Sequence, residues 1–256
     1  MFGKRILLLA PHPDDEVVGA SAAIGRAKAA GGEVFVAFLS TGVPDRALLW
    51  PWRRQGHAGR VARRRAESEA AAKLLGFTVA LFQEIPTRRL KSELAGTRAR
   101  LVDLIARRQI DMVWVPAYEG AHQDHDAANF VAATFKDRVQ VWEFAEYNNA
   151  GGRTHSQEFP DPNGSEIELR LREREIAAKR AALALYGSER GNLAHIQVGR
   201  EAFRPLAAYD YARPPHQGVL FYQRFQWVWP RHPRVDYTKP QEVCDAIGAF
   251  RARART

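Results

Sequence analysis

The sequence has a single cysteine, Cys244, among 256 residues, and it has no apolar run long enough to cross a membrane. One cysteine excludes an intramolecular disulfide framework and a zinc site built from cysteines, and it fits a reducing compartment. Lys4 and Arg5 precede apolar residues as they would in a signal peptide, but the apolar run is too short for one. We therefore expect a cytoplasmic protein without membrane insertion.

The sequence also lacks the motifs of common nucleic-acid-binding modules and the Gly-x-Gly-x-x-Gly fingerprint of dinucleotide-binding folds. Its 38 lysines and arginines exceed its 29 acidic residues, so the formal net charge is +9. The charge is dispersed except for arginine runs at 53–54, 60–65 and 251–255, which are typical of a solvated face or of a site for an anionic part of a substrate. A basic nucleic-acid-binding module is an alternative that rests on charge alone, and we expect no nucleic-acid partner.

The most distinctive stretch is Pro11 to Glu16, with the sequence Pro-His-Pro-Asp-Asp-Glu. It follows the apolar run 6–10, which predicts a buried strand, and precedes a segment that predicts a helix. Ligands bind at this carboxyl edge of the strands in open α/β sheets. His12 and Asp15 can hold a borderline divalent metal, with Asp14 free beside them. A turn with a helix cap is the alternative, but a cap needs one acceptor rather than a histidine and three acids.

A second polar cluster, His122 to Asp126, lies beyond the end of another apolar strand, predicted over 112–116. Two separate strands thus bring histidine and aspartate side chains to the same edge of a presumed parallel sheet. The alternative is a polar loop in which Asp124 caps the next helix. That alternative accounts for Asp124, but it does not account for four polar residues of metal-ligand type among five.

The two motifs, in this order and about a hundred residues apart, resemble the PIG-L/LmbE-like family of metal-dependent N-deacetylases. The family includes the N-acetylglucosaminyl-phosphatidylinositol de-N-acetylase and the deacetylases of mycothiol and bacillithiol biosynthesis. Either motif alone is weak, whereas the pair is highly specific. Stretches 64–76, 179–188 and 201–203 are similar to further segments of the family, so the resemblance covers roughly residues 4–204.

The resemblance implies one catalytic zinc ion per chain, held by three side chains from the two motifs: His12, Asp15 and His125. A site of this composition also accepts Fe²⁺ or Co²⁺. The resemblance further implies that Asp14 is the general base and that His122, as an imidazolium, stabilises the oxyanion or acts as an acid. Asp124 is expected to orient His122. The implied reaction is hydrolysis of the acetamide of an N-acetylglucosamine-type conjugate.

The substrate-binding residues are less specific. Arg64 and Arg65 fit the spacing of the family about equally well, and Tyr118 precedes the second motif. The long loop 41–57 leaves the same edge as His12 and carries Trp52, so we expect it to wall the pocket. Aromatic and arginine side chains suit a small-molecule N-acetylated amino-sugar conjugate.

Two positions depart from the family pattern. Gly120 stands where some family members have a tyrosine, two residues before the first histidine of the second motif. The stretch Pro86-Thr87-Arg88 stands where many members carry an acidic residue in a Pro-Asp-Gly-like turn. We expect these departures to affect the sugar contacts rather than the metal site.

The alternation of strands and helices predicts an α/β, Rossmann-like three-layer fold with a mostly parallel sheet. We expect a deacetylase domain over 1–204 and a C-terminal extension over 205–256 that packs on it or forms an oligomer interface, so that a homo-oligomer is possible. The expected strands are 4–10, 33–40, 79–82, 111–116 and 139–144, with an aromatic, strand-like stretch at 219–229. The expected helices are 15–30, 58–75, 92–107, 124–135 and 165–185, with a short one from 240.

A metal-dependent phosphoesterase is the main alternative enzyme, because aspartate and histidine clusters also serve two-metal phosphoester hydrolysis. That chemistry usually needs additional carboxylates from further strands, and none stand out in this sequence.

Overall fold

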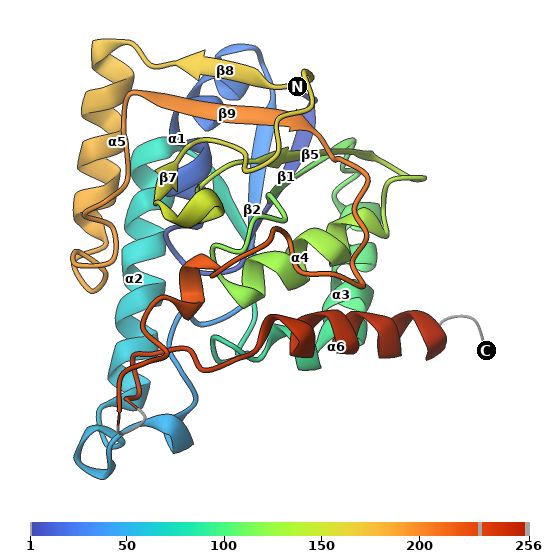
Figure 1. Cartoon of the computed structure of the whole chain (residues 1–256). Helices are drawn as coiled ribbons and strands as arrows, with labels where there is room; N and C mark the ends of the chain where they lie inside the picture. The colour runs from blue at the N-terminus through green and yellow to red at the C-terminus, as the bar shows by residue number, and fades with distance from the viewer. Residues whose placement is uncertain (1, 230–231, 254–256) are drawn as a thin grey trace.

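The computed structural model describes residues 2–229 and 232–253, and its centre is a seven-stranded sheet (Figure 1). The strand order is β3-β2-β1-β4-β5-β9-β8, in which the first five strands are parallel and the last two antiparallel. The strands are β1 (Arg5–Ala10), β2 (Glu33–Phe38), β3 (Thr78–Phe82), β4 (Met112–Pro116), β5 (Gln140–Phe144), β8 (Ile167–Arg170) and β9 (Arg200–Pro205). The expected α/β fold with a mostly parallel sheet is confirmed.

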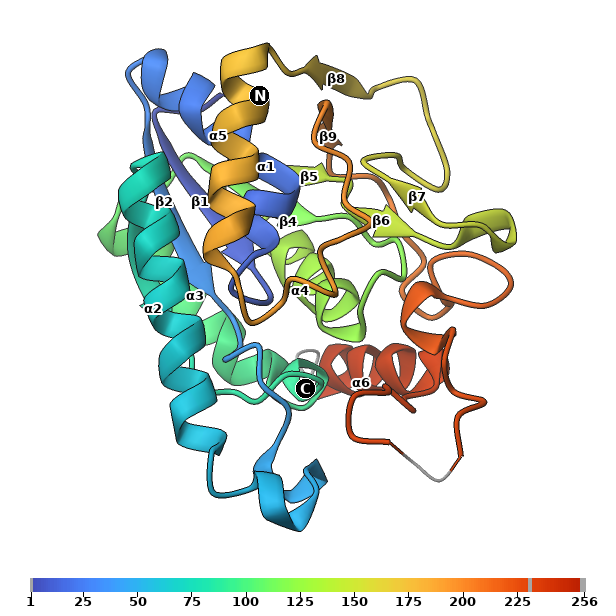
Figure 2. The same ribbon diagram turned by 90° about the vertical axis from the view of Figure 1, so that its left-hand side faces the viewer.

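Helices cover both faces of this sheet, giving three layers (Figures 1 and 2). One face packs against α1 (Asp15–Ala29), α2 (His57–Leu75) and α5 (Glu173–Leu185). The other face packs against α3 (Leu94–Arg107), α4 (Gln123–Ala133) and α6 (Pro240–Arg253). Within the described ranges, no helix is both long and apolar enough to span a membrane.

The order of the strands explains why the two polar motifs meet. From β1 the chain continues to β2 and β3 on one side, whereas β4 pairs with the other side of β1. After β1 the chain crosses toward one edge of the sheet, and after β4 it crosses toward the other edge. A crevice therefore opens between the carboxyl ends of these two strands. Motif 11–16 follows β1, and motif 122–126 follows β4.

The predicted helix over 165–185 is wrong in its first part. Residues 167–170 form β8, paired antiparallel with β9, and the helix begins only at Glu173. The carboxylate of Glu166 accepts hydrogen bonds from the backbone of Asn163 and Gly164, so it stabilises a turn and not a helix start. Pairing with a distant strand therefore outweighs the local helical preference.

The strand-like stretch 219–229 is not a strand. It contains the short 3₁₀ helix η5 (Phe221–Gln223) and turns, although its aromatic composition favours strands. The backbone N–H of Phe221 donates to the carbonyl of Gly120, which joins this stretch to the loop before the second motif. Gly120 has a φ of 70°, and a Cβ atom there would lie 2.8 Å from Leu220. Because glycine has no side chain, Leu220 of the extension can pack against the backbone at position 120.

Candidate metal centre

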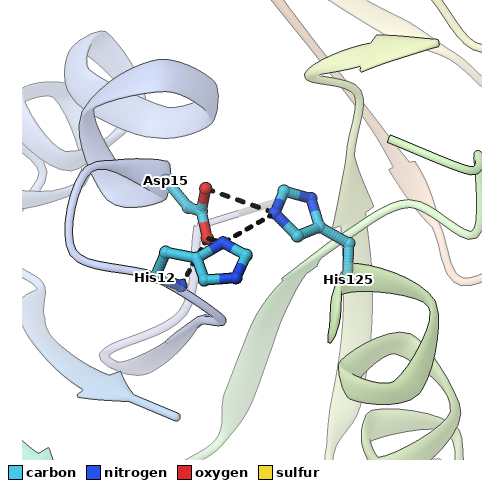
Figure 3. Close-up of side chains that lie close together, drawn as sticks. All are labelled: His12, Asp15 and His125. Atoms are coloured by element: carbon cyan, nitrogen blue, oxygen red, sulfur yellow. Dashed lines mark hydrogen bonds and ion pairs between the residues drawn. The ribbon is translucent and has the colours of Figure 1, made fainter. Parts of the chain in front are cut away.

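Three side chains from the two motifs converge at the carboxyl ends of β1 and β4 (Figure 3). His12 lies in the turn after β1, Asp15 is the first residue of α1, and His125 lies in the first turn of α4. His12 Nδ1 is 3.2 Å from His125 Nε2 and 3.3 Å from a carboxylate oxygen of Asp15, whose other oxygen is 3.3 Å from His125 Nε2. All three residues are at least nine-tenths buried.

These separations suit a small divalent cation. Ligand atoms about 2.0–2.1 Å from a tetrahedral zinc lie about 3.3–3.4 Å from one another. The electrostatic environment also favours a cation at this position. Burial by itself lowers the pKa of His12, but Asp15 and Asp124 raise this pKa to about 10. The two carboxylates thus favour positive charge at this point. Two imidazoles and one carboxylate are also a ligand set used in hydrolytic zinc sites.

The Asp124 carboxylate contacts His12 at Nε2, whereas the other two candidate ligands contact its Nδ1. Its Oδ2 atom is 3.1 Å from His12 Nε2, whereas it is 3.7 Å from His122 Nδ1. A carboxylate that binds one ring nitrogen fixes the tautomer and leaves the other nitrogen free for a metal. Asp124 therefore contacts His12 more directly than His122, the partner expected from the sequence.

His125 faces a second buried carboxyl group, that of Glu146. The Nδ1 atom of His125 is 3.5 Å from Glu146 Oε2. Among the described residues, neither this nitrogen nor the carboxylate oxygens of Glu146 have a hydrogen-bond partner. Burial raises the pKa of Glu146 well above its ordinary value. Glu146 was not among the residues predicted from the sequence. The only available signal was its place just after β5, which pairs with β4.

Asp14 lies beside the three candidate ligands but outside their triangle. Its backbone is strained, with a φ of 144°, and its carboxylate is 3.3 Å from a guanidinium nitrogen of Arg64. Burial raises the pKa of Asp14 to about 7, although the charge of Arg64 opposes this shift. Such a carboxyl can exchange a proton near neutral pH. Gly42 leaves room for the Arg64 guanidinium beside Asp14, since a Cβ atom at position 42 would lie only 2.7 Å from Arg64 Nε.

His122 is the most exposed of the three histidines, and the centre of its ring is 4.5 Å from that of His12. Burial, and then the charge of His12, lower the pKa of His122 well below its ordinary value. This favours a neutral ring over the imidazolium expected from the sequence. Because Nδ1 accepts the backbone N–H of Asp124, the neutral ring carries its proton on Nε2.

The remaining predicted site residues lie away from the centre. Arg65 pairs with Glu84 and lines a groove along α2, so of the two adjacent arginines only Arg64 reaches Asp14. Tyr118 is buried, and its hydroxyl donates to the carbonyl of Arg213. Trp52 is 74% exposed, stacked on Trp50 in the loop before α2.

An aromatic cluster that the sequence did not indicate lies next to His125. The ring of Tyr147 is 6.1 Å from His125, 4.5 Å from Phe221 and 5.0 Å from His195. The guanidinium of Arg224 lies 3.2 Å above the Phe221 ring. Three segments far apart in the sequence supply these rings, so no local pattern could reveal the cluster.

Several solved structures share this fold. The A40926 pseudoaglycone deacetylase has 22% identity and a TM-score of 0.61, over 80% of this chain and 99% of its own. The N,N'-diacetylchitobiose deacetylase of Pyrococcus horikoshii has 19% identity and a TM-score of 0.53, over 83% and 84%. The 4-carboxy-2-hydroxymuconate hydratase of Pseudomonas putida has 20% identity and a TM-score of 0.53, over 81% and 98%. At these identities the comparisons show the fold alone.

A comparison with curated protein sequences gave no significant match. Residues 7–136, in contrast, match the PIG-L family, described as GlcNAc-PI de-N-acetylase. The matched region is just over half of the 256 residues and contains both polar motifs. The chain therefore belongs to the PIG-L family of N-deacetylases, as its two motifs predicted.

Proposed function

We propose that this protein is a zinc-dependent hydrolase that removes the acetyl group from an N-acetylglucosamine-type conjugate. The observation that carries the proposal is the triangle of His12, Asp15 and His125 with the Asp14 carboxylate beside it. A zinc ion bound there supplies a water of lowered pKa and Lewis acidity at the acetamide carbonyl. Fe²⁺ or Co²⁺ can take its place in such a ligand set.

Asp14 is the proposed general base. Its carboxylate takes a proton from the attacking water and later passes it to the leaving amine. Arg64 holds this carboxylate in place at 3.3 Å, and the same guanidinium is 3.4 Å from Glu189, so both groups are oriented before substrate binds. Arg64 is buried and has two carboxylate partners. When Asp14 accepts a proton, Arg64 therefore still has Glu189 as a charged partner.

His122 is the proposed stabiliser of the developing oxyanion. A neutral imidazole with its proton on Nε2 can donate one hydrogen bond, and Nδ1 is already used by the backbone of Asp124. A fixed donor of this kind needs no protonation change during the reaction. The role expected from the sequence is retained, but with a neutral ring.

Replacing His122 with alanine should lower kcat about 10²–10³-fold, as the loss of one oxyanion donor does. Zinc content should stay at one ion per chain, because His122 is outside the ligand triangle. Turnover and metal content measured on the same preparation check this. A variant that loses its zinc would show that His122 is a ligand.

The aromatic cluster beside His125 suits stacking against a sugar ring. Replacing Phe221 with alanine should raise KM for a sugar substrate about tenfold, or about 1.4 kcal/mol, with kcat nearly unchanged. Trp52→Ala is the matched control, since Trp52 is an exposed aromatic that lies on Trp50. A larger effect from Trp52→Ala than from Phe221→Ala would place the sugar on the loop 41–57 instead.

The direct test is a substrate panel. Zinc-loaded protein is incubated with N-acetylglucosamine conjugates, simple N-acyl amines, phosphodiesters and a hydroxymuconate, the last because a hydratase shares the fold. Release of acetate and amine from the sugar conjugates supports the proposal. Hydrolysis of phosphodiesters with every acetamide intact would favour the phosphoesterase alternative.

A further inference from the structure

One contact between the C-terminal extension and the surroundings of the candidate metal centre is made by Arg88, in the turn after β3. The guanidinium of Arg88 donates to three consecutive carbonyl groups of the extension, those of Pro233, Arg234 and Val235, at 3.0, 2.9 and 3.0 Å. Three donors to adjacent carbonyls hold the side chain in one orientation. Arg88 is separated from these carbonyl groups by 145 to 147 positions in the sequence.

The backbone of the same residue holds Asp124. The N–H of Arg88 donates to Asp124 Oδ2 at 2.6 Å, and the Thr87 hydroxyl donates to the same oxygen at 3.0 Å. The N–H of Leu90 donates to Oδ1 at 3.2 Å. One short turn therefore supplies three donors to the carboxylate that contacts His12 at 3.1 Å. The departure from the family pattern at 86–88 thus bears on the candidate metal centre, contrary to the expectation from the sequence.

This turn is conformationally strained. Arg88 has a φ of 72°, in the left-handed region that side chains with a Cβ rarely adopt. The strained conformation points its N–H at Asp124. A strained residue persists only where surrounding contacts determine its conformation. At Arg88 those contacts include the carbonyls of segment 233–235 and the Asp124 carboxylate.

The segment that supplies the carbonyls is itself fixed. The side-chain amide of Gln123 donates to the Asp236 carboxylate at 2.7 Å and to the Thr238 hydroxyl at 2.6 Å. Gln123 is the first residue of α4, the helix that carries Asp124 and His125. The extension is thus anchored to the same helix whose aspartate the turn holds.

We propose that Arg88 is a positioning residue for the metal centre: clamped by the carbonyls of 233–235, it keeps Asp124 against His12 and so sets the affinity of the site for a divalent cation. The inference rests on the metal site of the proposed function, and it gives the extension a role. The matched PIG-L region ends at residue 136, so the clamp combines a turn inside this region with a segment outside it.

The test is the zinc dissociation constant of the full chain, measured by competition with a chromophoric chelator. Arg88→Ala should weaken zinc binding about tenfold, at the lower end of the effect of outer-shell partners. Arg88→Gly should weaken it less, because glycine adopts a φ of 72° without strain and keeps the N–H. Arg89→Ala is the control, since Arg89 is half-exposed and pairs with Asp45. Circular dichroism verifies the fold of each variant.

A second measurement separates positioning from general stability. In an Asp124→Asn variant, the carboxylate that accepts the Arg88 N–H is already replaced by an amide. Adding Arg88→Ala to this variant should therefore cause little further loss of zinc affinity. Wild-type affinity in Arg88→Ala, or an undiminished tenfold loss in the Asp124→Asn background, would overturn the inference. Zinc binding by the wild type without any acetate release would refute the proposed reaction and leave this inference standing. A wild type that binds no zinc would refute both.

Discussion

Replacing Asp14 with asparagine should slow turnover about 10²–10⁴-fold, because an amide cannot take the proton that the general base removes from water. Zinc should remain bound, since the ligand triangle of His12, Asp15 and His125 does not include Asp14. Asparagine nearly preserves the volume of the side chain, and its oxygen can still accept from Arg64. The loss should therefore fall on kcat rather than on folding. Steady-state kinetics and metal analysis of one preparation measure both quantities.

The neighbouring arginines provide the control for this prediction. Arg64→Ala should also lower kcat, because it removes the partner of the Asp14 carboxylate, whereas Arg65→Ala should leave kcat unchanged. The two residues are adjacent in α2, so non-specific effects on the helix would appear in both. If Asp14→Asn kept wild-type turnover, another group would have to serve as the base.

Replacing Asp15 with alanine should weaken zinc binding by more than the roughly 10–100-fold typical of outer-shell partners, and activity should disappear with the metal. Asp15 contacts both histidines through its two oxygens, and it also accepts the backbone N–H of His12 at 2.6 Å. Its removal therefore deletes one ligand and loosens a second. Chelator competition measures the affinity, and excess zinc should restore part of the activity.

Comparison of the two aspartates decides between their roles. Asp14 and Asp15 are adjacent and both buried, yet only Asp15 lies in the ligand triangle. Metal loss in Asp15→Ala together with metal retention in Asp14→Asn supports the assignment. Equal metal loss in both variants would show that the pair shares the metal.

Much of the fold was predictable because its signals are local. The apolar runs that became β1, β2 and β4 are nearly continuous, as expected of strands buried on both faces. Helix α1 ends two residues before Gly31 and α2 ends directly before Gly76, as their sequences indicate. The error at 167–170 occurred where an antiparallel edge strand depends on pairing with β9, which is far away in sequence. The error at 219–229 occurred where aromatic residues that favour strands form a 3₁₀ helix and turns instead.

The sequence by itself determined the family and most of the residues that meet at the candidate metal centre, although not Glu146. Their types and spacing are local, and parallel strands bring their carboxyl ends to one edge whatever the side chains beyond. Only the tertiary structure decided which neighbour each of these residues contacts. Arg64 reaches Asp14 although Arg65 does not, because successive residues of a helix point in different directions and the packing of α2 selects one. Asp124 supports His12, and Arg88 joins both to the extension, because hydrogen bonds between distant segments depend on where the backbone places them and leave no periodic trace in the sequence.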